Sequence, residues 1–146
     1  MAMGVRIRRM QGGDVPAVVG IERRITGSRR TSALGPYLRR ALRTKEGVCL
    51  VAEVDGEAAG FLVGDVRPWE FGEDREVAWV KVVGVDPRHQ GDGLGGLLGR
   101  RFLKELKGKG IRRVKTLVEW DSGDLVAYFQ SLGFHRAGAI VLERSV

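Results

Sequence analysis

The sequence predicts an α/β fold in which a central, mixed and mostly antiparallel sheet carries helices on both faces. Two strand-like runs, 48–54 and 58–66, flank Asp55-Gly56, which is typical of a two-residue hairpin turn. Further on, a valine-rich run enters a glycine-rich turn and is followed by apolar residues at helical spacing. The hairpin predicts antiparallel pairing, whereas the later strand–helix–strand order requires a crossover and therefore parallel pairing.

The first half of the chain opens with alternating apolar and charged residues over 5–8, as in a half-buried strand. Asp14 as a cap and Pro16 in the first turn then predict the start of a helix. The polar stretch 26–32 indicates a loop, and a second helix is expected over 36–43. The two strands of the hairpin follow.

The second half contains a long strand at 76–85 and a helix that begins near Leu94 and ends before Gly110. A strand is expected at 111–120, a short helix at 125–132 and a last strand at 139–143. A chain of 146 residues is long enough to bury its own core, so residues 1–146 are expected to form one domain.

The composition narrows the function classes. The net charge of +7 and the sequence pI near 10.2 are carried by scattered basic pairs without interleaved aromatic residues, so no specific nucleic-acid partner is expected. Short apolar runs and the absence of a signal-like N-terminus argue against a membrane association. The single cysteine, Cys49, excludes a disulfide within the chain, and we expect a cytoplasmic protein without a metal site.

The turn within 82–98 predicts an anion site. Four glycines, Gly91, Gly93, Gly95 and Gly96, allow backbone N–H groups to approach a ligand closely. The first N–H groups of a helix lack partners, and the helix dipole favours a phosphate there. Glycine inside a helix costs about 1 kcal/mol relative to alanine. We therefore expect a close approach at Gly95, Gly96 and Gly99, by a ligand or by packing of the helix on the sheet.

Three motifs occur in a familiar order. They are the hairpin at 51–61, the run Gln90-Gly91-Asp92-Gly93-Leu94-Gly95, and Leu132-Gly133-Phe134 after a short helix. Together they resemble the GNAT superfamily of acetyl-CoA-dependent N-acetyltransferases, whose pyrophosphate motif is Gln/Arg-x-x-Gly-x-Gly/Ala. The register from Arg88 also fits these letters, but the one from Gln90 matches the spacing from the preceding strand better.

The resemblance implies a sheet splayed between its fourth and fifth strands and acetyl-CoA as the co-substrate. Backbone groups of Val83, Gly84 and Val85 would pair with the pantetheine arm in the splay. The pyrophosphate would be held by the motif residues Gln90, Gly91, Asp92, Gly93, Leu94 and Gly95. Because a carboxylate repels a diphosphate, we expect Asp92 to point to solvent. Phe129 is also expected beside the cofactor, at a position where many family members have tyrosine.

The catalytic residues are less well defined. Phe129 has no proton to give, and its neighbour Tyr128 is either the general acid or a packing residue, since one helical step rotates a side chain by about 100°. Transfer without a protein acid is the other alternative. Glu119 and Glu76 are the candidate bases, each alternatively a solvated surface residue, and His89 suits a phosphate or turn contact better.

The function implied by the resemblance is direct acetyl transfer, in a ternary complex, to the primary amine of a small molecule or peptide. The alternative is a catalytically weak acyl-CoA-binding sensor or interaction module of the same fold. A homodimer is among the expected states, because dimers are common in such proteins. The acceptor would contact residues of the first two helices and the loops near them, namely Glu22, Arg23, Arg24, Thr26, Ser28, Arg29, Arg30, Tyr37, Trp69 and Glu70.

Overall fold

The computed structural model describes residues 4–27, 31–70, 73–119 and 121–146. Within them, a five-stranded sheet has the order β1-β2-β3-β4-β5. The strands are β1 (Val5–Arg9), β2 (Gly47–Val54), β3 (Glu57–Arg67), β4 (Val77–Val85) and β5 (Val114–Thr116). The first four pair antiparallel, and β5 pairs parallel with β4.

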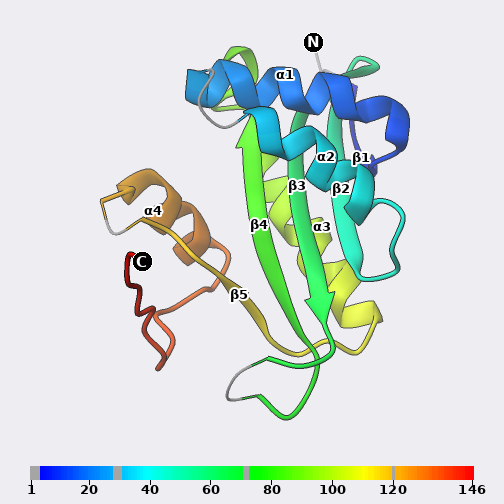
Figure 1. The fold of residues 1–146 in the computed structure, drawn as a ribbon. Coiled ribbons are helices and arrows are strands. Elements are labelled where there is room, and N and C mark those ends of the chain that lie inside the picture. Colours follow the sequence, from blue (N-terminus) through cyan, green and yellow to red (C-terminus); the bar gives the residue numbers. More distant parts are fainter. Residues whose placement is uncertain (1–3, 28–30, 71–72, 120) are drawn as a thin grey trace.

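Helices lie on both faces of this sheet (Figure 1). The chain forms α1 (Val15–Thr26), α2 (Thr31–Ala41), α3 (Leu94–Gly108) and α4 (Gly123–Ser131). The helices α1 and α2 cover one face, α3 covers the other, and α4 lies to the side of the sheet (Figure 1). The expected mixed sheet between helices is therefore confirmed.

Side-chain alternation along β2 divides the core into two layers. Val48, Leu50 and Ala52 belong to the buried cluster on the α3 face, whereas Cys49 and Val51 belong to the cluster under α1 and α2. All five are at most 6% exposed. Because both faces are covered, this strand is an unbroken apolar run in the sequence.

The hairpin between β2 and β3 turns at the expected residues. Asp55 and Gly56 both have positive φ, at 51° and 85°, as a type I′ turn requires. Val54 pairs with Glu57 directly across the turn. This part of the prediction is confirmed.

The last two strands pair only briefly. Ala78–Val80 of β4 faces Val114–Thr116 of β5, and the two chains then diverge (Figure 1). The expected strand at 111–120 is therefore too long, because residues beyond Thr116 leave the sheet; Trp120 itself lies outside the described residues. A register shift between β3 and β4 leaves Lys81 without a partner residue, just where the divergence begins. The expected splay between the fourth and fifth strands is confirmed.

Two other expectations about elements are wrong. Helix α2 starts at Thr31 instead of 36 and contains Pro36 in its interior. Of the loop expected at 26–32, Thr26 lies in α1 and residues 31–32 lie in α2, whereas residues 28–30 lie outside the described residues. The last strand expected at 139–143 does not form in the described structure: this segment has no strand pairing, and Ile140 and Leu142 are 82% and 85% exposed. No described helix combines the length and apolar character that crossing a lipid bilayer requires.

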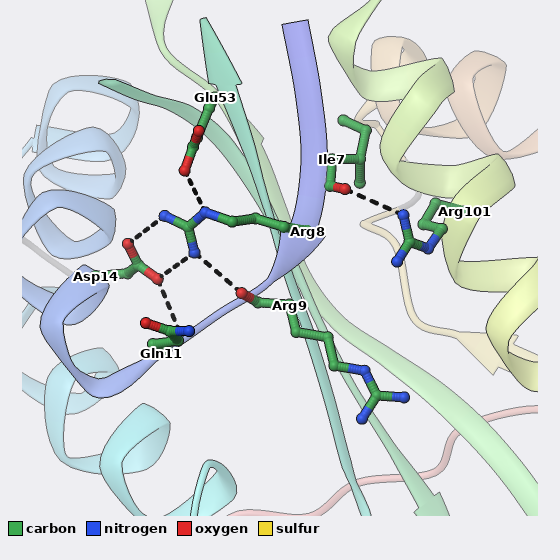
Figure 2. A network of polar contacts seen from close by, with 7 residues as sticks. All are labelled: Ile7, Arg8, Arg9, Gln11, Asp14, Glu53 and Arg101. Atoms are coloured by element: carbon green, nitrogen blue, oxygen red, sulfur yellow. Dashed lines mark hydrogen bonds and ion pairs between the residues drawn. The ribbon is translucent and has the colours of Figure 1, made fainter. Parts of the chain in front are cut away.

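A polar network fixes the turn from β1 into α1 (Figure 2). Arg8 binds both carboxylate oxygens of Asp14 at 2.7 Å and also reaches Glu53 on β2. The Asp14 carboxylate also accepts the N–H of Gln11 at 2.7 Å, so it does not cap α1 through its side chain as expected. The Arg8 hydrogen bonds hold the pKa of Asp14 below its usual value.

Candidate functional site

The turn between β4 and α3 is shaped by Gly91 and Gly93, whose φ angles are +89° and +80°. Residues other than glycine rarely adopt these φ angles. A Cβ atom at either position would meet no atom within 4 Å, so there is open space beside the turn. Backbone conformation, and not lack of room, therefore requires glycine at both positions.

The start of α3 provides unpartnered amides next to this open space. Gly93 is the N-cap, and Leu97 is the first residue whose N–H donates within the helix, to the Gly93 carbonyl at 3.2 Å. The N–H groups of residues 94–96 precede it and so have no intrahelical acceptor. Leu94 anchors this turn in the core at 1% exposure. The arrangement suits a bound anion.

Side chains around the turn leave it accessible. Gln90 and Asp92 are exposed, as expected for Asp92, and the carboxylate of Asp92 lies 3.6 Å from Nδ1 of His89. The buried Nδ1 atom of His89 has no hydrogen-bond partner among the described residues. The backbone is thus the principal source of donors at this turn.

The buried carboxylate of Asp86 stabilises the residues that lead into the turn between β4 and α3. Asp86 is fully buried and accepts hydrogen bonds from the backbone N–H of Arg88 at 3.0 Å and from its guanidinium at 2.8 Å. Arg24 of α1 donates to the same carboxylate at 2.8 Å. These bonds, with the Arg88 side chain contributing most, hold the pKa of Asp86 well below its usual range. One buried anion therefore connects α1 to the loop and leaves a net positive charge beside it.

The edge of β4 that faces the splay carries backbone N–H groups without a partner strand. Neighbouring N–H groups along a strand point to opposite edges. The N–H of Asp86 donates to Ala59 of β3 at 2.8 Å, so the N–H groups of Val85 and Val83 are directed to the other edge. On that edge, no described strand pairs with β4 beyond Val80. Two donors are thus available there for an extended ligand.

Gly84 lies between Val83 and Val85, and its lack of a side chain matters for packing. A Cβ atom there would be 2.8 Å from the ring of Phe61 and 2.9 Å from Ile25. Its hydrogen side chain therefore lets β3 and α1 approach β4 closely.

The glycines inside α3 allow helix-on-helix packing. A Cβ atom at Gly99 would lie 2.4 Å from Leu132 and 2.9 Å from the Tyr128 hydroxyl, and one at Gly95 would lie 3.2 Å from the Tyr128 ring. At Gly96 only the side chain of Arg100 comes near, at 3.0 Å. The expected close approach is therefore made at Gly95 and Gly99 by the α4 side of the molecule. Packing of α3 on the sheet, one of the two alternatives given for these glycines, is not what crowds them.

Tyr128 is held by this packing. Its hydroxyl donates to the Gly95 carbonyl at 2.7 Å, and its ring meets Phe129 edge-on at a centroid distance of 4.9 Å. Burial raises the pKa of Tyr128 to about 12, so the phenol is neutral near pH 7. Both observations favour the packing interpretation. Phe129 is 5% exposed and packs into the core between Tyr128 and Phe134.

The two candidate carboxylates lie at different ends of the splay. Glu119 is exposed and follows β5, three residues beyond the last paired residue, Thr116. Glu76 is exposed and precedes β4, at the end where β4 and β5 are joined. At about 3.3 Å per residue, Glu76 lies roughly 25 Å along the strand from Gly84. The geometry therefore favours Glu119 over Glu76.

A comparison with models of protein families identifies the family of this chain. The model described as "Acetyltransferase (GNAT) family" matches residues 16–134, which is most of the chain. The chain belongs to the GNAT acetyltransferase family. The sequence resemblance to this superfamily is thereby confirmed.

Curated relatives of this GNAT chain include mycothiol acetyltransferases. The protein of Amycolatopsis mediterranei is 42% identical over 101 residues, covering 67% of this chain and 33% of the relative. That of Saccharomonospora viridis is 33% identical over 141 residues, covering 90% of this chain and 46% of the relative. The chain thus spans a third to a half of the length of these relatives.

Solved structures share the fold over the whole chain. An aminoglycoside N-acetyltransferase AAC(6')-Iy in complex with CoA has a TM-score of 0.85 at 19% identity, covering 99% of this chain and 97% of that one. A transcriptional regulator from Bacillus halodurans has a TM-score of 0.84, also at 19% identity, covering 98% of this chain and all of that one. Similarity at this identity shows the GNAT fold alone.

Several long-range contacts of this GNAT chain could not be found from the sequence. The contact of Arg24 with Asp86 joins positions 62 residues apart, and no local sequence pattern indicates it. The contacts of Trp79 are likewise not indicated by the sequence. Its Nε1 donates to Glu70, and Arg67 and Lys81 each lie 5.7 Å from its ring centroid.

Among the expected acceptor residues, Glu70 is therefore bound to Trp79, Arg24 is occupied by Asp86, and Glu22 is buried. Ser28, Arg29 and Arg30 lie outside the described residues. Within the described parts of the chain, no three His, Cys, Asp or Glu side chains gather as a metal ion would need.

Proposed function

We propose that residues 1–146 form a single domain that transfers the acetyl group of acetyl-CoA to a primary amine, directly and within a ternary complex. The observation that carries the proposal is the continuity of two features on one strand. The unpaired edge of β4 runs straight into the glycine turn and the free amides of α3. An elongated ligand with a phosphorylated end fits this combination, and membership of the GNAT family supports it.

The residues present suit acetyl-CoA. The open space at Gly91 and Gly93 leaves room for a diphosphate against the free N–H groups at the start of α3. We assign this group to Gln90, Gly91, Asp92, Gly93, Leu94 and Gly95, with Asp92 contributing its backbone. The N–H group of Val85 would pair with the pantetheine arm as an added strand does, which leaves the N–H group of Val83 free for the thioester.

The transfer forms a C–N bond between the acceptor and the acetyl carbonyl carbon and breaks the C–S bond of the thioester. A backbone N–H at Val83 would donate to the carbonyl oxygen as negative charge develops on it. The amine must arrive neutral, and Glu119 is our candidate to remove its proton through a water molecule. Glu76 is the weaker candidate because it lies at the closed end of the strand pair.

Protonation of the departing thiolate is assigned to water or to the proton released by the amine. A thiol has an unperturbed pKa near 8.5, so proton transfer from Tyr128 with a pKa of about 12 would be unfavourable. The Tyr128 hydroxyl is also already bonded to Gly95. We therefore propose that Tyr128 of α4 is not the general acid.

The names of similar proteins guide the choice of acceptors. They include mycothiol, L-2,4-diaminobutyric acid and aminoglycoside acetyltransferases. A panel of aminoglycosides, diamino acids, polyamines and peptides should be incubated with acetyl-CoA while the release of free CoA is followed. We expect turnover with at least one primary amine. Tight CoA binding with no turnover on any amine would instead favour a binding module of the same fold.

The role of Glu119 has its own test. For Glu119→Gln we expect the acidic limb of the pH profile of kcat/KM to shift, with unchanged CoA affinity. The matched control is Glu76→Gln, for which we expect an unaltered profile. An unchanged profile for Glu119→Gln would remove this residue from the mechanism.

A further inference from the structure

A tryptophan ring and a lysine ammonium lie together on β4, on the sheet face that carries α1 and α2. Trp79 pairs with Asp65 of β3, and paired residues share a face of the sheet. Ala78 and Val80, its neighbours along the strand, belong to the buried cluster on the α3 face, so the Trp79 side chain is on the opposite face. The ammonium of Lys81 lies 5.7 Å from the centroid of the Trp79 ring, which is within the range of a cation–π contact.

Two carboxylates beside this ring are already bound to other groups. Glu70 accepts a hydrogen bond from Nε1 of Trp79 and lies 3.5 Å from Arg67. Asp65 lies 3.6 Å from the same arginine. By contrast, no carboxylate of the described residues is within ion-pair distance of the ammonium of Lys81, whose side chain is exposed. The positive charge of Lys81 is therefore available to a ligand.

This lysine lies where β5 separates from β4. Val80 is the last residue of β4 that pairs with β5, and Lys81 follows it. On this face the helices cross β4 near its C-terminal end, where Ile25 of α1 lies beside Gly84 (Figure 1). Lys81 precedes that crossing, so its exposed side chain lies next to the opening between the two strands.

An acceptor amine reaches the thioester from the side of the splay that acetyl-CoA leaves free. The proposed diphosphate site is at the start of α3, and α4 packs against α3, so the cofactor lies on the α3 side. The side of α1 and α2 is then left for the acceptor. Lys81 is two residues before Val83, whose N–H is the proposed donor to the thioester carbonyl, and the two are therefore roughly 7 Å apart along the strand.

We propose that the acceptor carries an anionic group, a carboxylate or a phosphate, and that Lys81 binds this group while the amine attacks the thioester beside Val83. The inference rests on the acetyltransferase function proposed above. An ammonium has three N–H donors, and its hydrogen bonds to an anion are stronger than those between neutral groups. Trp79 is a positioning residue, because its ring, fixed by the bond to Glu70, helps to hold the ammonium in place. The net charge of +7 also attracts an anionic acceptor to the molecule.

Acceptors that differ in one charge test the proposal. The probes are β-alanine, γ-aminobutyrate and ε-aminocaproate, each paired with its primary amide, and O-phosphoethanolamine paired with ethanolamine. Release of free CoA gives kcat/KM, and the preferred pair distinguishes a carboxylate from a phosphate. We expect kcat/KM to be about tenfold higher for the acid than for its neutral partner in at least one pair, because only the acid forms a charge-assisted hydrogen bond with Lys81.

Variants of Lys81 separate the effect of this charge from other differences between the acid and its neutral partner. In Lys81→Gln the ratio of the two kcat/KM values should fall about tenfold, and in Lys81→Arg most of it should return. Comparison of one ratio between proteins cancels the different basicities of the two amines. Lys104→Gln is the matched control, since Lys104 is an exposed residue of α3 on the other face of the sheet and its loss should leave the ratio unchanged. Isothermal titration of the preferred acid into the CoA complex gives a second readout without turnover, and the affinity should also fall in Lys81→Gln.

A ratio that is unchanged in Lys81→Gln would overturn the proposal. So would a native protein that acetylates ethanolamine or the amides but none of the acids. CoA binding without turnover of any amine would refute the acetyltransferase function and this inference with it. Titration with CoA is performed on every variant, so that loss of the cofactor site is distinguished from loss of the acceptor site.

Discussion

At the scale of single residues, the site depends on backbone conformation and on one buried charge. Gly91 and Gly93 hold positive φ angles in open space, so their role lies in the path of the chain. Asp86 fixes the start of the same turn through Arg88 and Arg24. The chemistry proposed for this site therefore needs few side chains of its own.

Gly93→Ala should weaken CoA binding about tenfold. An L side chain at this φ costs roughly 1–2 kcal/mol, and that strain is relieved only if the turn changes shape. Isothermal titration with CoA measures the effect. Gly108→Ala is the matched control, because Gly108 lies in the last turn of α3, a Cβ atom there meets nothing within 4 Å, and its φ is not positive. Equal CoA affinities for the two variants would show that the conformation of the turn does not matter for binding.

Tyr128→Phe should lower stability while leaving turnover within about threefold of the native value. The variant loses the hydrogen bond to Gly95, which contributes on the order of 1 kcal/mol. Thermal unfolding and steady-state kinetics with the best acceptor measure the two effects. A fall in kcat of a hundredfold or more with unchanged CoA affinity would instead make Tyr128 the general acid.

At the scale of elements, the position of α4 is decided by the glycines of α3. Gly95 and Gly99 lie one turn apart on one face of the helix, and Tyr128 and Leu132 pack against them. Their cost in helix propensity is offset by this contact. The same residues bring α4 beside the first turn of α3, next to the proposed diphosphate site.

Gly99→Ala should destabilise the protein by about 1–3 kcal/mol, because its Cβ atom would lie 2.4 Å from Leu132 in a closely packed contact. Gly96→Ala should have the opposite sign and stabilise the helix by up to about 1 kcal/mol, since only the flexible Arg100 side chain is near. Urea unfolding of both variants gives the comparison. Similar changes in the free energy of unfolding would contradict the packing described for α4.

At the scale of the whole molecule, ion pairs connect different elements of the fold. Arg8 and Asp14 join β1 to the start of α1, and Arg24 joins α1 to the Asp86 turn. Both carboxylates have folded-state pKa values below their ordinary ones because of these arginines. A basic chain thus uses part of its positive charge to hold its elements together.

The pH dependence of stability follows from this. A carboxyl group with a lowered folded-state pKa contributes stability above its unfolded pKa, near 3.9, and loses it as the pH falls through the folded value. We expect the free energy of unfolding to fall steeply below about pH 4. Asp86→Asn should lower stability at pH 7 by about 2–3 kcal/mol and flatten the acid dependence. Asp74→Asn, at an exposed loop residue, is the control, and an equally steep acid loss in both variants would exclude Asp86 as a cause.

Local patterns were enough to predict much of this molecule. The Asp55-Gly56 hairpin, the long strand before the glycine turn and the end of α3 before Gly110 depend on backbone preferences of a few adjacent residues. The anion site proposed at Gly91 and Gly93 is likewise a local property, because positive φ and free helix amides arise within one turn.

Only the tertiary structure decided the rest, because those features depend on contacts between distant segments. β5 has three paired residues because β4 diverges from it, although its sequence would support a longer strand. The 139–143 segment has the composition of a strand but pairs with no strand among the described residues. The bond between Arg24 and Asp86, and the packing of Tyr128 on Gly95, join residues 62 and 33 positions apart. A short sequence pattern carries no information about such pairs, since each exists only after the chain has folded.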